Sequence, residues 1–374
     1  MHTSMPLIRK CLATTLISAL AMLCGSAYAI TSAADKAAQP QAAAVDIVAE
    51  LPMRPGNVAA TKEGRIFATV HPLGKPSGLQ LIEITGKKSF VAWPGKQYQN
   101  DGVHFTEDRI DTPLGIYRDK HNNLWIIDMG LHLGKTRAWG FNIASGKLLK
   151  RYDLAADIAP KGSFVQDLVV DEERGWMYLA DIANPGLIAL DMKTGQAHRF
   201  SNHPALQAEP DAKMIIDGKQ ILFQGKPAEV AVNPISLSAD GETLYFGAMN
   251  GRSWYSLPAR RLRNGASDAV IGAAISRVGA KPISDGAAID AYGNHYFTNV
   301  TERGIDVLDT NGVLRPFVRD ARMIWPDGLQ FGAPDALYLS VNQLYKAAGF
   351  TGGEEQGKPP FYIFKIRTRY TAAN

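Results

Sequence analysis

The chain has 374 residues, of which 46% are hydrophobic, and a formal net charge of +4. A chain of this length and composition can bury an extensive core. Its 40 basic and 36 acidic residues are interspersed without a basic run or stripe, which argues against binding to nucleic acid or to a membrane surface. We therefore expect a small-molecule ligand.

The first 29 residues have the pattern of a secretory signal peptide. Arg9 and Lys10 form a short basic region, residues 11–23 are mostly apolar, and residues 27–29 (Ala-Tyr-Ala) give a cleavage signal. A membrane anchor is the weaker alternative, because the apolar run is short for a bilayer span and no stop-transfer pattern follows it. We expect the signal peptide to be removed, leaving a periplasmic or secreted protein without a membrane anchor.

The two cysteines, Cys11 and Cys24, both lie in this segment. The mature chain would then contain no disulfide and would depend on its hydrophobic core for stability. Residues 30–44 are rich in alanine and are predicted to form a flexible leader. Residues 45–370 are predicted to form one domain, and we expect that domain to be monomeric.

A short phrase recurs along the predicted domain. Each copy has an apolar run, a polar turn and a Leu-Tyr-like pair, and the copies begin 42 to 67 residues apart. The six copies begin at Gly56, Leu114, Gln166, Asn233, Asp285 and Asp327. A hairpin-forming unit that repeats every 40–60 residues or so is typical of a β-propeller with one blade per copy. The predicted fold is therefore an all-β, six-bladed β-propeller.

The segments between copies support this architecture. A second hairpin follows in most copies, for example residues 186–192 with residues 196–200, which gives the four strands that a blade requires. No segment has a sustained helical period, which disfavours an α/β fold. Residues 46–51 and 361–370 are both strand-like, and we expect them to share the last blade and so close the ring.

Three longer insertions interrupt the pattern, at residues 97–111, 204–230 and 345–360. Loops on one face of a rigid scaffold often carry specificity, so these segments are candidates for a lid over the central tunnel. The alternative is that they decorate the solvated rim.

The first residues of the copies indicate where a site should lie. In a propeller they occupy the start of the innermost strands, so their side chains should surround the axis at one mouth of the tunnel. Carboxylate and amide oxygens gathered there would suit a divalent cation such as Ca²⁺ or Mg²⁺, and a carboxylate left unbound would serve as a general base. The alternative for each residue is a local turn in which its side chain accepts backbone hydrogen bonds.

Specific roles follow from this arrangement. We predict catalytic roles for Asp285 and Asp327, substrate binding by Gln166, Asp167, Asn57 and Trp325, and cation binding by Asn233 and Asp285. Trp325 either walls the tunnel mouth against a ring-shaped ligand or packs in the core. His71, His104 and His132 lie in loops without metal-ligand spacing and are expected at the surface.

Several phrases resemble the Yellow/major royal jelly protein family. They include PLGIYRDKHNNLWIIDMG (residues 113–130) and the more specific ending WPDGL…LYLSVNQL, followed by PPFYIFKI. The resemblance extends from about residue 46 to residue 367. It implies a six-bladed propeller, and bacterial members of the family are described as dopachrome-tautomerase-related.

A wider resemblance is to propellers of the regucalcin and gluconolactonase type, which hold a metal ion on the axis. By blade order, Asn233 and Asp285 match two of the ligands of that family, and Gln166 replaces an asparagine that contacts substrate. Gly56 stands where the family has a glutamate ligand, so one carboxylate is absent here. This departure counts against a metal-dependent lactonase.

Three functions are compatible with the sequence. The first is small-molecule binding in the axial tunnel, with tautomerase or isomerase activity on catechol-derived or similar cyclic compounds. The second is a metal-dependent sugar lactonase, in which the cation polarises the lactone carbonyl. The third is a non-enzymatic binding protein of the cell envelope.

Overall fold

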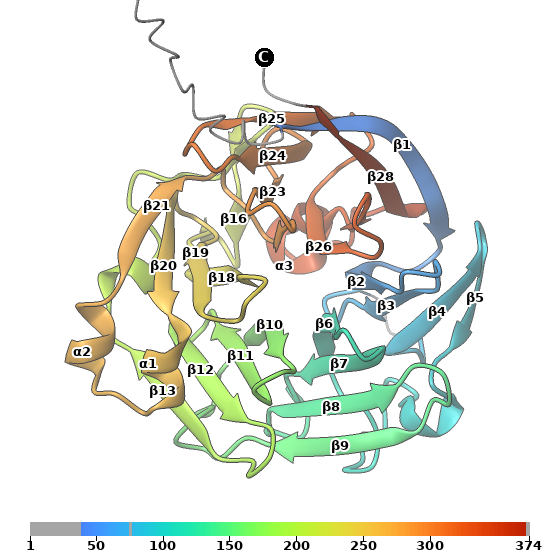
Figure 1. Ribbon diagram of the computed structural model, residues 1–374. Coiled ribbons are helices and arrows are strands. Elements are labelled where there is room, and N and C mark those ends of the chain that lie inside the picture. The colour runs from blue at the N-terminus through green and yellow to red at the C-terminus, as the bar shows by residue number, and fades with distance from the viewer. Residues whose placement is uncertain (1–38, 75–76, 372–374) are drawn as a thin grey trace, which may run out of the picture. The chain divides into compact units, whose positions relative to one another are not determined.

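The computed structural model of the chain describes residues 39–371 except residues 75 and 76. Six four-stranded antiparallel sheets surround a central axis, which confirms the predicted six-bladed β-propeller (Figure 1). The predicted signal peptide, with both cysteines, and residues 30–38 of the predicted leader lie outside the described residues.

Each blade is a meander in which the first strand of the copy is innermost. Blade 1 contains β2 (Pro55–Ala60), β3 (Ile66–Val70), β4 (Leu81–Gly86) and β5 (Ser89–Ala92). Blade 2 contains β6 (Pro113–Arg118), β7 (Asn123–Asp128), β8 (Arg137–Asn142) and β9 (Leu148–Asp153). Blade 3 contains β10 (Val165–Asp171), β11 (Trp176–Asp181), β12 (Gly186–Asp191) and β13 (Ala197–Ser201).

The second half of the ring repeats this plan. Blade 4 contains β18 (Val232–Leu237), β19 (Thr243–Ala248), β20 (Ser253–Pro258) and β21 (Ser276–Ala280). Blade 5 contains β22 (Ala287–Ile289), β23 (His295–Asn299), β24 (Gly304–Leu308) and β25 (Leu314–Arg319). Blade 6 contains β26 (Pro326–Phe331), β27 (Ala336–Val341), β28 (Phe361–Thr371) and β1 (Gln39–Leu51).

The two ends of the described chain close the ring in blade 6. Strand β1 pairs antiparallel with β28 from Gln39 opposite Thr371 to Leu51 opposite Phe361. The predicted closure is therefore confirmed. Residues 39–44, which we assigned to a flexible leader, belong instead to β1, because the long strand β28 offers them backbone groups to pair with.

The innermost strands contact one another in the order β2, β6, β10, β18, β22 and β26, and β26 contacts β2. Their packing at the axis is tight. A Cβ atom added to Gly115 would lie 2.4 Å from the Gln166 carbonyl oxygen, and one added to Gly286 would lie 2.2 Å from that of Asp327. Glycine at these positions lets neighbouring strands approach closely enough to form a narrow tunnel.

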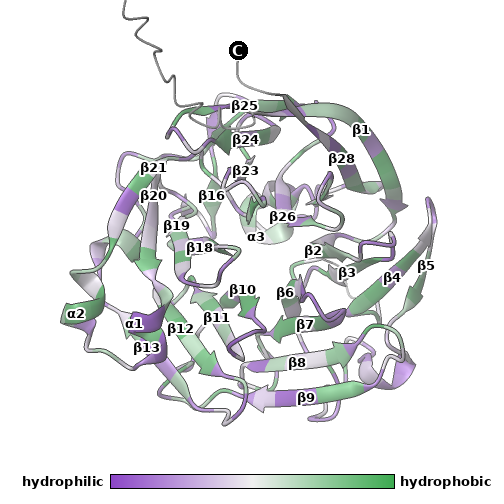
Figure 2. Cartoon of the chain, in the orientation of Figure 1, coloured by the Kyte–Doolittle hydropathy of each residue, from purple (hydrophilic) through white to green (hydrophobic). Residues whose placement is uncertain are grey.

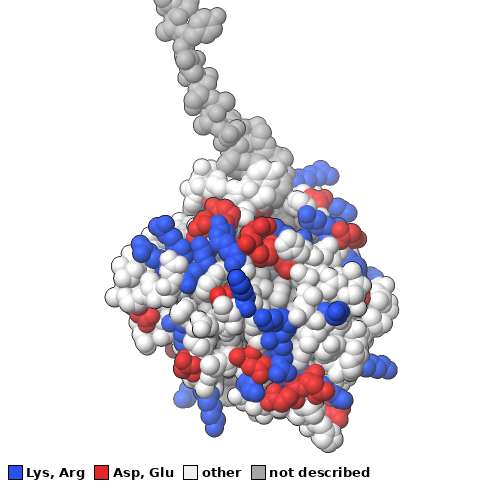
Figure 3. Space-filling view, turned by 60° about the horizontal axis from the view of Figure 1, so that its bottom comes forward, with Lys and Arg blue, Asp and Glu red and all other residues white. Residues whose placement is uncertain are grey.

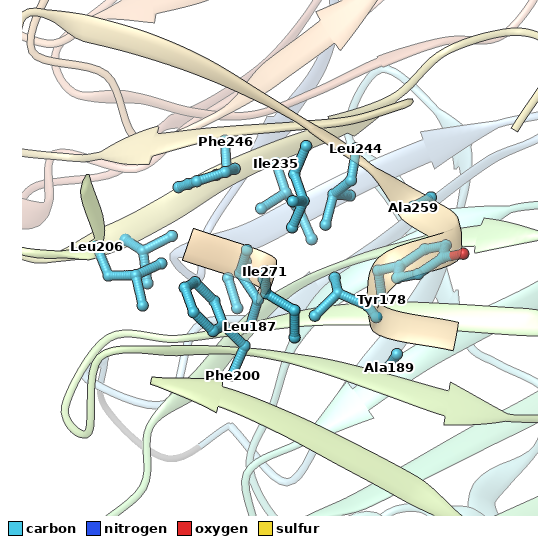
Figure 4. Close-up of a cluster of buried hydrophobic side chains, with 14 of the residues drawn as sticks. Tyr178, Leu187, Ala189, Phe200, Leu206, Ile235, Leu244, Phe246, Ala259 and Ile271 are labelled. Carbon is cyan, nitrogen blue, oxygen red and sulfur yellow. The ribbon is translucent and has the colours of Figure 1, made fainter. Parts of the chain in front are cut away.

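The hydrophobic core lies between neighbouring blades. In one cluster Tyr178 and Phe200 of blade 3 pack against Phe246 of blade 4, beneath the short helices α1 (Ala259–Arg263) and α2 (Asp268–Gly272) (Figure 4). The hydropathy colouring shows apolar residues along the strands of every blade (Figure 2). Acidic and basic side chains are interspersed on the face shown in Figure 3. Among the described residues, no helix has the length and hydropathy needed to cross a bilayer.

Two of the three insertions form a lid at the mouth where the copies begin. The insertion at 204–230 contains η2 (Pro204–Leu206) and two small ribbons, and the insertion at 345–360 begins within η3 (Leu344–Lys346) and contains α3 (Ala348–Thr351). The ribbons are β14 (Ile215–Ile216) with β15 (Lys219–Gln220), and β16 (Leu222–Phe223) with β17 (Lys226–Pro227).

These two insertions, which we call the lid, contact each other. The Gln224 N–H donates to the Gly349 carbonyl oxygen at 2.8 Å, and the rings of Phe223 and Phe350 lie 4.9 Å apart. The insertion at 97–111 behaves differently. It begins within η1 (Lys96–Tyr98), and Tyr98 packs edge-on against Trp139 and Phe141 of blade 2, on the rim. The lid interpretation therefore fits two insertions and the rim interpretation fits the third.

Candidate functional site

The innermost strands are bulged at the residues that begin the copies. In five blades the pairing of the first and second strands shifts between Pro55 and Val58, or between the corresponding residues of β6, β10, β18 and β26. A β-bulge bends a strand and changes the direction of the side chains within it. The copies aligned from the sequence therefore have the same register in the structure. In these five blades a bulge lies where the copy begins, and it changes the direction of the side chains there.

Hydroxyl groups on the second strands bind the backbone where several copies begin, including blade 5, whose described residues form no bulge at this point. Thr298 Oγ1 accepts hydrogen bonds from the N–H groups of both Asp285 and Gly286, each at 3.0 Å. In blade 1 Thr69 Oγ1 accepts from the Asn57 N–H at 3.0 Å. Because these backbone groups are paired with hydroxyl groups, they need no hydrogen bond from the site side chains, which are free to point inward.

Asp285 is the centre of the arrangement. Its Oδ1 atom accepts hydrogen bonds from Gln166 Nε2 at 3.0 Å and from Asn233 Nδ2 at 2.5 Å. Its Oδ2 atom accepts one from the Trp325 indole N–H at 2.6 Å. The donors come from blades 3, 4 and 6 and converge on a carboxyl group of blade 5 that is only 3% exposed. Four of the residues predicted from the sequence are therefore in direct contact.

Burial raises the pKa of Asp285, while the three hydrogen bonds and the charge of nearby Lys281 act in the opposite direction. Lys281 is itself buried, and its ammonium group donates to the Pro282 carbonyl oxygen at 2.9 Å. Burial lowers the pKa of Lys281 to about 7. The carboxyl group at the centre of the site is therefore more readily protonated than an exposed aspartate.

Trp325 reaches Asp285 through an unusual backbone conformation. Its φ angle is 57°, in the left-handed region, which costs a residue with a side chain roughly 1–2 kcal/mol. The Asn342 N–H donates to the Trp325 carbonyl oxygen at 3.2 Å and helps to hold this conformation. The indole lies against Tyr345 and Phe350 of the lid, with ring centroids 6.3 and 5.7 Å away. Trp325 thus both packs in a buried cluster and borders the cavity described below.

The other two predicted carboxylates, Asp327 and Asp167, lie close enough to Asp285 for their charges to interact. Asp327 accepts a hydrogen bond from Asn342 Nδ2 at 2.5 Å, and its Oδ1 atom is buried without a partner in the described part of the chain. Burial raises the pKa of Asp327 well above its usual value, and the charge of Asp285 raises it further. Asp167 accepts a hydrogen bond from the Leu168 N–H at 2.8 Å, and burial raises its pKa to about 7.

A cavity of about 470 Å³ separates the ring of polar residues from the lid. Gln166, Asp285 and Trp325 line its inner end. Its walls are mainly apolar and consist of Leu73, Leu114, Phe164, Ile182, Ala183, Phe223, Pro227, Ala228, Val230, Met249, Leu344 and Phe350. Lys226 and Glu229 bring charged groups to the lid side. We call this space the lid cavity.

The structure places Asn57 and Asp167 elsewhere. Both line a second cavity, on the tunnel side of the ring, and neither borders the lid cavity. Gln166 and Asp167 are adjacent at the bulge of β10, and there one residue lines the lid cavity and the other lines the tunnel side. The predicted substrate-binding set is therefore divided between two cavities.

His71, which we expected at the surface, is a buried residue of the lid cavity. Its Nδ1 atom accepts a hydrogen bond from the Leu73 N–H at 3.1 Å, which assigns the ring hydrogen to Nε2. Burial lowers the pKa of His71 to about 3, so the ring is neutral near pH 7. His71 directly follows the second strand of its blade, as Ile182 and Met249 directly follow β11 and β19, and all three residues line the lid cavity. An alignment of the copies that extended past the second strands could therefore have identified His71 as a site residue.

The hydrogen-bond donors around Asp285 affect whether this group could bind the predicted cation. Both oxygens of Asp285 receive N–H groups, so Asn233 and Asp285 contact each other through a hydrogen bond and not as two parallel oxygen ligands. No group of three His, Cys, Asp or Glu side chains suited to a metal ion occurs among residues 39–74 and 77–371. Three buried amide or carboxylate oxygens near the axis have no partner in that part of the chain: Asn57 Oδ1, Asn233 Oδ1 and Asp327 Oδ1.

The sequence profile of the major royal jelly protein family matches residues 112–349. The chain belongs to the major royal jelly protein family. This match confirms the resemblance carried by the repeated phrases, and it covers blades 2 to 5, part of blade 6, the first lid insertion and the start of the second. A sequence search of curated proteins finds no match.

Solved structures of other propellers share the fold of this major royal jelly family protein. A catalytically inactive virginiamycin B lyase from Staphylococcus aureus with quinupristin has a TM-score of 0.52 at 12% identity, covering 88% of this chain and 99% of that chain. A gluconolactonase from Xanthomonas campestris has a TM-score of 0.52 at 12% identity, covering 88% and 95%. The calcium-binding protein regucalcin from Agrobacterium tumefaciens has a TM-score of 0.32 at 17% identity, covering 70% and 91%. At 12% identity the likeness to the lyase and the gluconolactonase concerns the fold alone.

Proposed function

We propose that this major royal jelly family protein binds a small cyclic organic molecule in the lid cavity and acts on it as a tautomerase or isomerase. The observation that carries the proposal is the convergence of three N–H donors, from three blades, on the Asp285 carboxyl group at the inner end of an apolar cavity. A carboxylate needed only for folding would require neither the cavity nor the strained backbone of Trp325.

The cavity defines the class of ligand. Its volume of about 470 Å³ lies in the range of small-molecule sites, which are typically apolar with a few placed polar groups. Phe164, Phe223 and Phe350 offer aromatic surfaces for a ring, and Asp285 and His71 offer an acceptor and a donor. A catechol-derived compound, with an apolar ring and two neighbouring oxygens, has this combination of groups.

The chemistry that Asp285 can supply is proton transfer. A tautomerisation moves a proton from one atom of the substrate to another, with no net gain or loss of atoms or electrons. A carboxyl group with a raised pKa can accept the proton at one position and return it at the other. The Nε2–H of neutral His71 would stabilise negative charge that develops on a substrate oxygen.

The test is the Asp285→Asn variant, which keeps the shape of the side chain but cannot transfer a proton in this way. Dopachrome decay measured with the wild-type protein should exceed the rate in buffer, and Asp285→Asn should lower kcat by about 10²–10⁴-fold. Asp240→Asn is the matched control, because Asp240 lies in the exposed hairpin turn of blade 4. A wild-type rate equal to the buffer rate would reject this substrate, and an active Asp285→Asn variant would reject the role of Asp285.

A second candidate, the metal-dependent lactonase, is favoured by one observation. The unpartnered oxygens of Asn57, Asn233 and Asp327 come from three blades and are of the type that Ca²⁺ and Mg²⁺ prefer. A cation that binds the native protein must raise the melting temperature by mass action. We would compare melting in EDTA with melting in Ca²⁺ or Mg²⁺, and repeat the comparison with Asp327→Asn. A cation-dependent rise that this variant abolishes would favour the lactonase, and gluconolactone would then be the first substrate to test.

We further propose that the protein is exported, on the basis of the basic and apolar segments of the first 29 residues. The mass of the protein recovered from the periplasm or medium should correspond to a chain that begins at Ile30. Recovery of the uncleaved chain from the cytoplasm would contradict export.

A further inference from the structure

The end of the tunnel opposite the lid contains a separate cavity of about 220 Å³, which we call the tunnel cavity. Gln166 and Asp285 line the lid cavity, while the residues that follow them, Asp167 and Gly286, line the tunnel cavity. The two spaces are therefore divided by the layer of side chains that surrounds Asp285. The function proposed above uses only the lid side of this layer.

Polar side chains reach the tunnel cavity from two levels of the innermost strands. Asn57 and Asp167 occupy the second position of copies one and three, and Tyr117, Ser236 and Gln330 occupy the fourth position of copies two, four and six. Five different blades thus contribute a hydrogen-bonding group to one small space. The remaining walls are largely aliphatic and include Ile116, Leu168, Ile235 and Leu329.

Several of these groups lack a partner in the protein. Asn57 Oδ1 and Ser236 Oγ are unpartnered among the described residues, and these side chains are only 7% and 4% exposed. The Nε atom of Arg118, at the outer end of the same cavity, is buried and also unpartnered there. Buried polar atoms are nearly always hydrogen-bonded, so the missing partners must be supplied by water or by a ligand.

We propose that the tunnel cavity binds a neutral polyhydroxylated molecule of monosaccharide size. A hydroxyl group can both donate and accept, which matches the acceptor of Asn57, the donor of Arg118 and the hydroxyl of Ser236. The guanidinium of Arg118 already donates to the carbonyl oxygens of Asp119 and Gly332, so the site, in the described part of the chain, has no free charged group for an ion and suits a neutral ligand. The volume corresponds to about seven water molecules, enough for a six-membered ring with its hydroxyl groups.

The test is a thermal-shift titration of the full mature protein with D-glucose and with myo-inositol. Polyols stabilise most proteins weakly by exclusion from the surface, with no saturation, whereas a bound ligand gives a rise that saturates. We expect a saturable rise of the melting temperature with at least one of the two compounds. Ser236→Ala should weaken the apparent affinity about fivefold, the effect of one hydrogen bond.

Two controls make the outcome decisive. Ser236→Ala should be at least as stable as the parent without added polyol, because it removes an unpartnered buried hydroxyl. Trp325 lines the lid cavity and not the tunnel cavity, so Trp325→Phe should keep the saturable rise and its midpoint, whatever the melting temperature of the variant without polyol. The proposal is overturned if no saturable rise occurs with either compound, which would leave ordered water as the occupant. It is equally overturned if the rise is lost in Trp325→Phe and kept in Ser236→Ala.

Discussion

The indole N–H of Trp325 lies 2.6 Å from Oδ2 of Asp285, and the left-handed backbone of Trp325 is what brings the two side chains together. This pair joins the neighbouring blades 5 and 6. It also links the lid to the carboxyl group, because Trp325 packs against Tyr345 and Phe350. Movement of the lid would therefore act directly on the hydrogen bonding of Asp285.

Replacing Trp325 with Phe tests this link. The ring is kept, but Asp285 loses one of its three hydrogen bonds, and these bonds favour its ionised form. We expect the free energy of unfolding to fall by about 1–3 kcal/mol at pH 7. We also expect the acidic limb of the activity profile to move to higher pH. Urea unfolding and a pH–rate profile measure the two effects.

Trp176→Phe, on β11 of blade 3, is the control for the loss of an indole away from the site. An unchanged pH profile in Trp325→Phe would show that the indole of Trp325 only fills space.

Asp167 should make the stability of the protein depend on pH. Its pKa is about 7 in the native state, against an ordinary value near 3.8, because the group is buried. The native state therefore keeps a proton that the unfolded chain releases, and the free energy of unfolding should fall as the pH rises from about 4 to about 7. The full effect would be up to about 4 kcal/mol. His71 acts in the opposite direction over part of this range, since its pKa is lowered to about 3.

The contribution of Asp167 is therefore measured as the difference in the free energy of unfolding between the parent and the Asp167→Asn variant. Urea unfolding of the parent and of Asp167→Asn at several pH values should show the variant gaining stability relative to the parent between pH 4 and 7. Asp240→Asn should show no such gain, because hydrogen bonding by Ser238 lowers the pKa of Asp240. Parallel pH curves for the parent and Asp167→Asn would refute the assignment.

The lid should contribute to ligand affinity more than to folding. Phe350 contacts Phe223 across the two insertions and the edge of Trp325 beneath them. Phe350→Ala should weaken ligand binding about tenfold through the loss of aromatic contacts, while the melting temperature changes little. Isothermal titration with a ligand identified in the activity screen gives the affinity, and Val313→Ala, in an exposed turn of blade 5, is the control. Unchanged affinity in Phe350→Ala would place the ligand outside the lid cavity.

Much of this arrangement could be predicted from the sequence because the repeat fixes a register. Gln166, Asn233 and Asp285 begin their copies, and a common register places them at one mouth of the tunnel. The division between cavities could not be predicted, because it depends on the direction that each bulge gives to adjacent residues such as Gln166 and Asp167. His71 was missed because it follows the second strand of its copy, outside the part of the phrase used for the alignment.

The closing strand offers a last prediction. Ala49 and Leu51 of β1 are buried in blade 6. Residues 39–44 form the first part of β1 and pair with the last residues of β28. A chain that begins at Val45 should therefore fold with only a modest loss of stability. A chain that begins at Pro52 exposes the whole edge of β28 and should aggregate or melt far below the parent, because an unpaired strand edge recruits other chains. Light scattering and thermal melting of both truncations, beside a chain that begins at Ile30, measure this. If the chain that begins at Pro52 melts like the parent, β1 does not contribute to closing the ring.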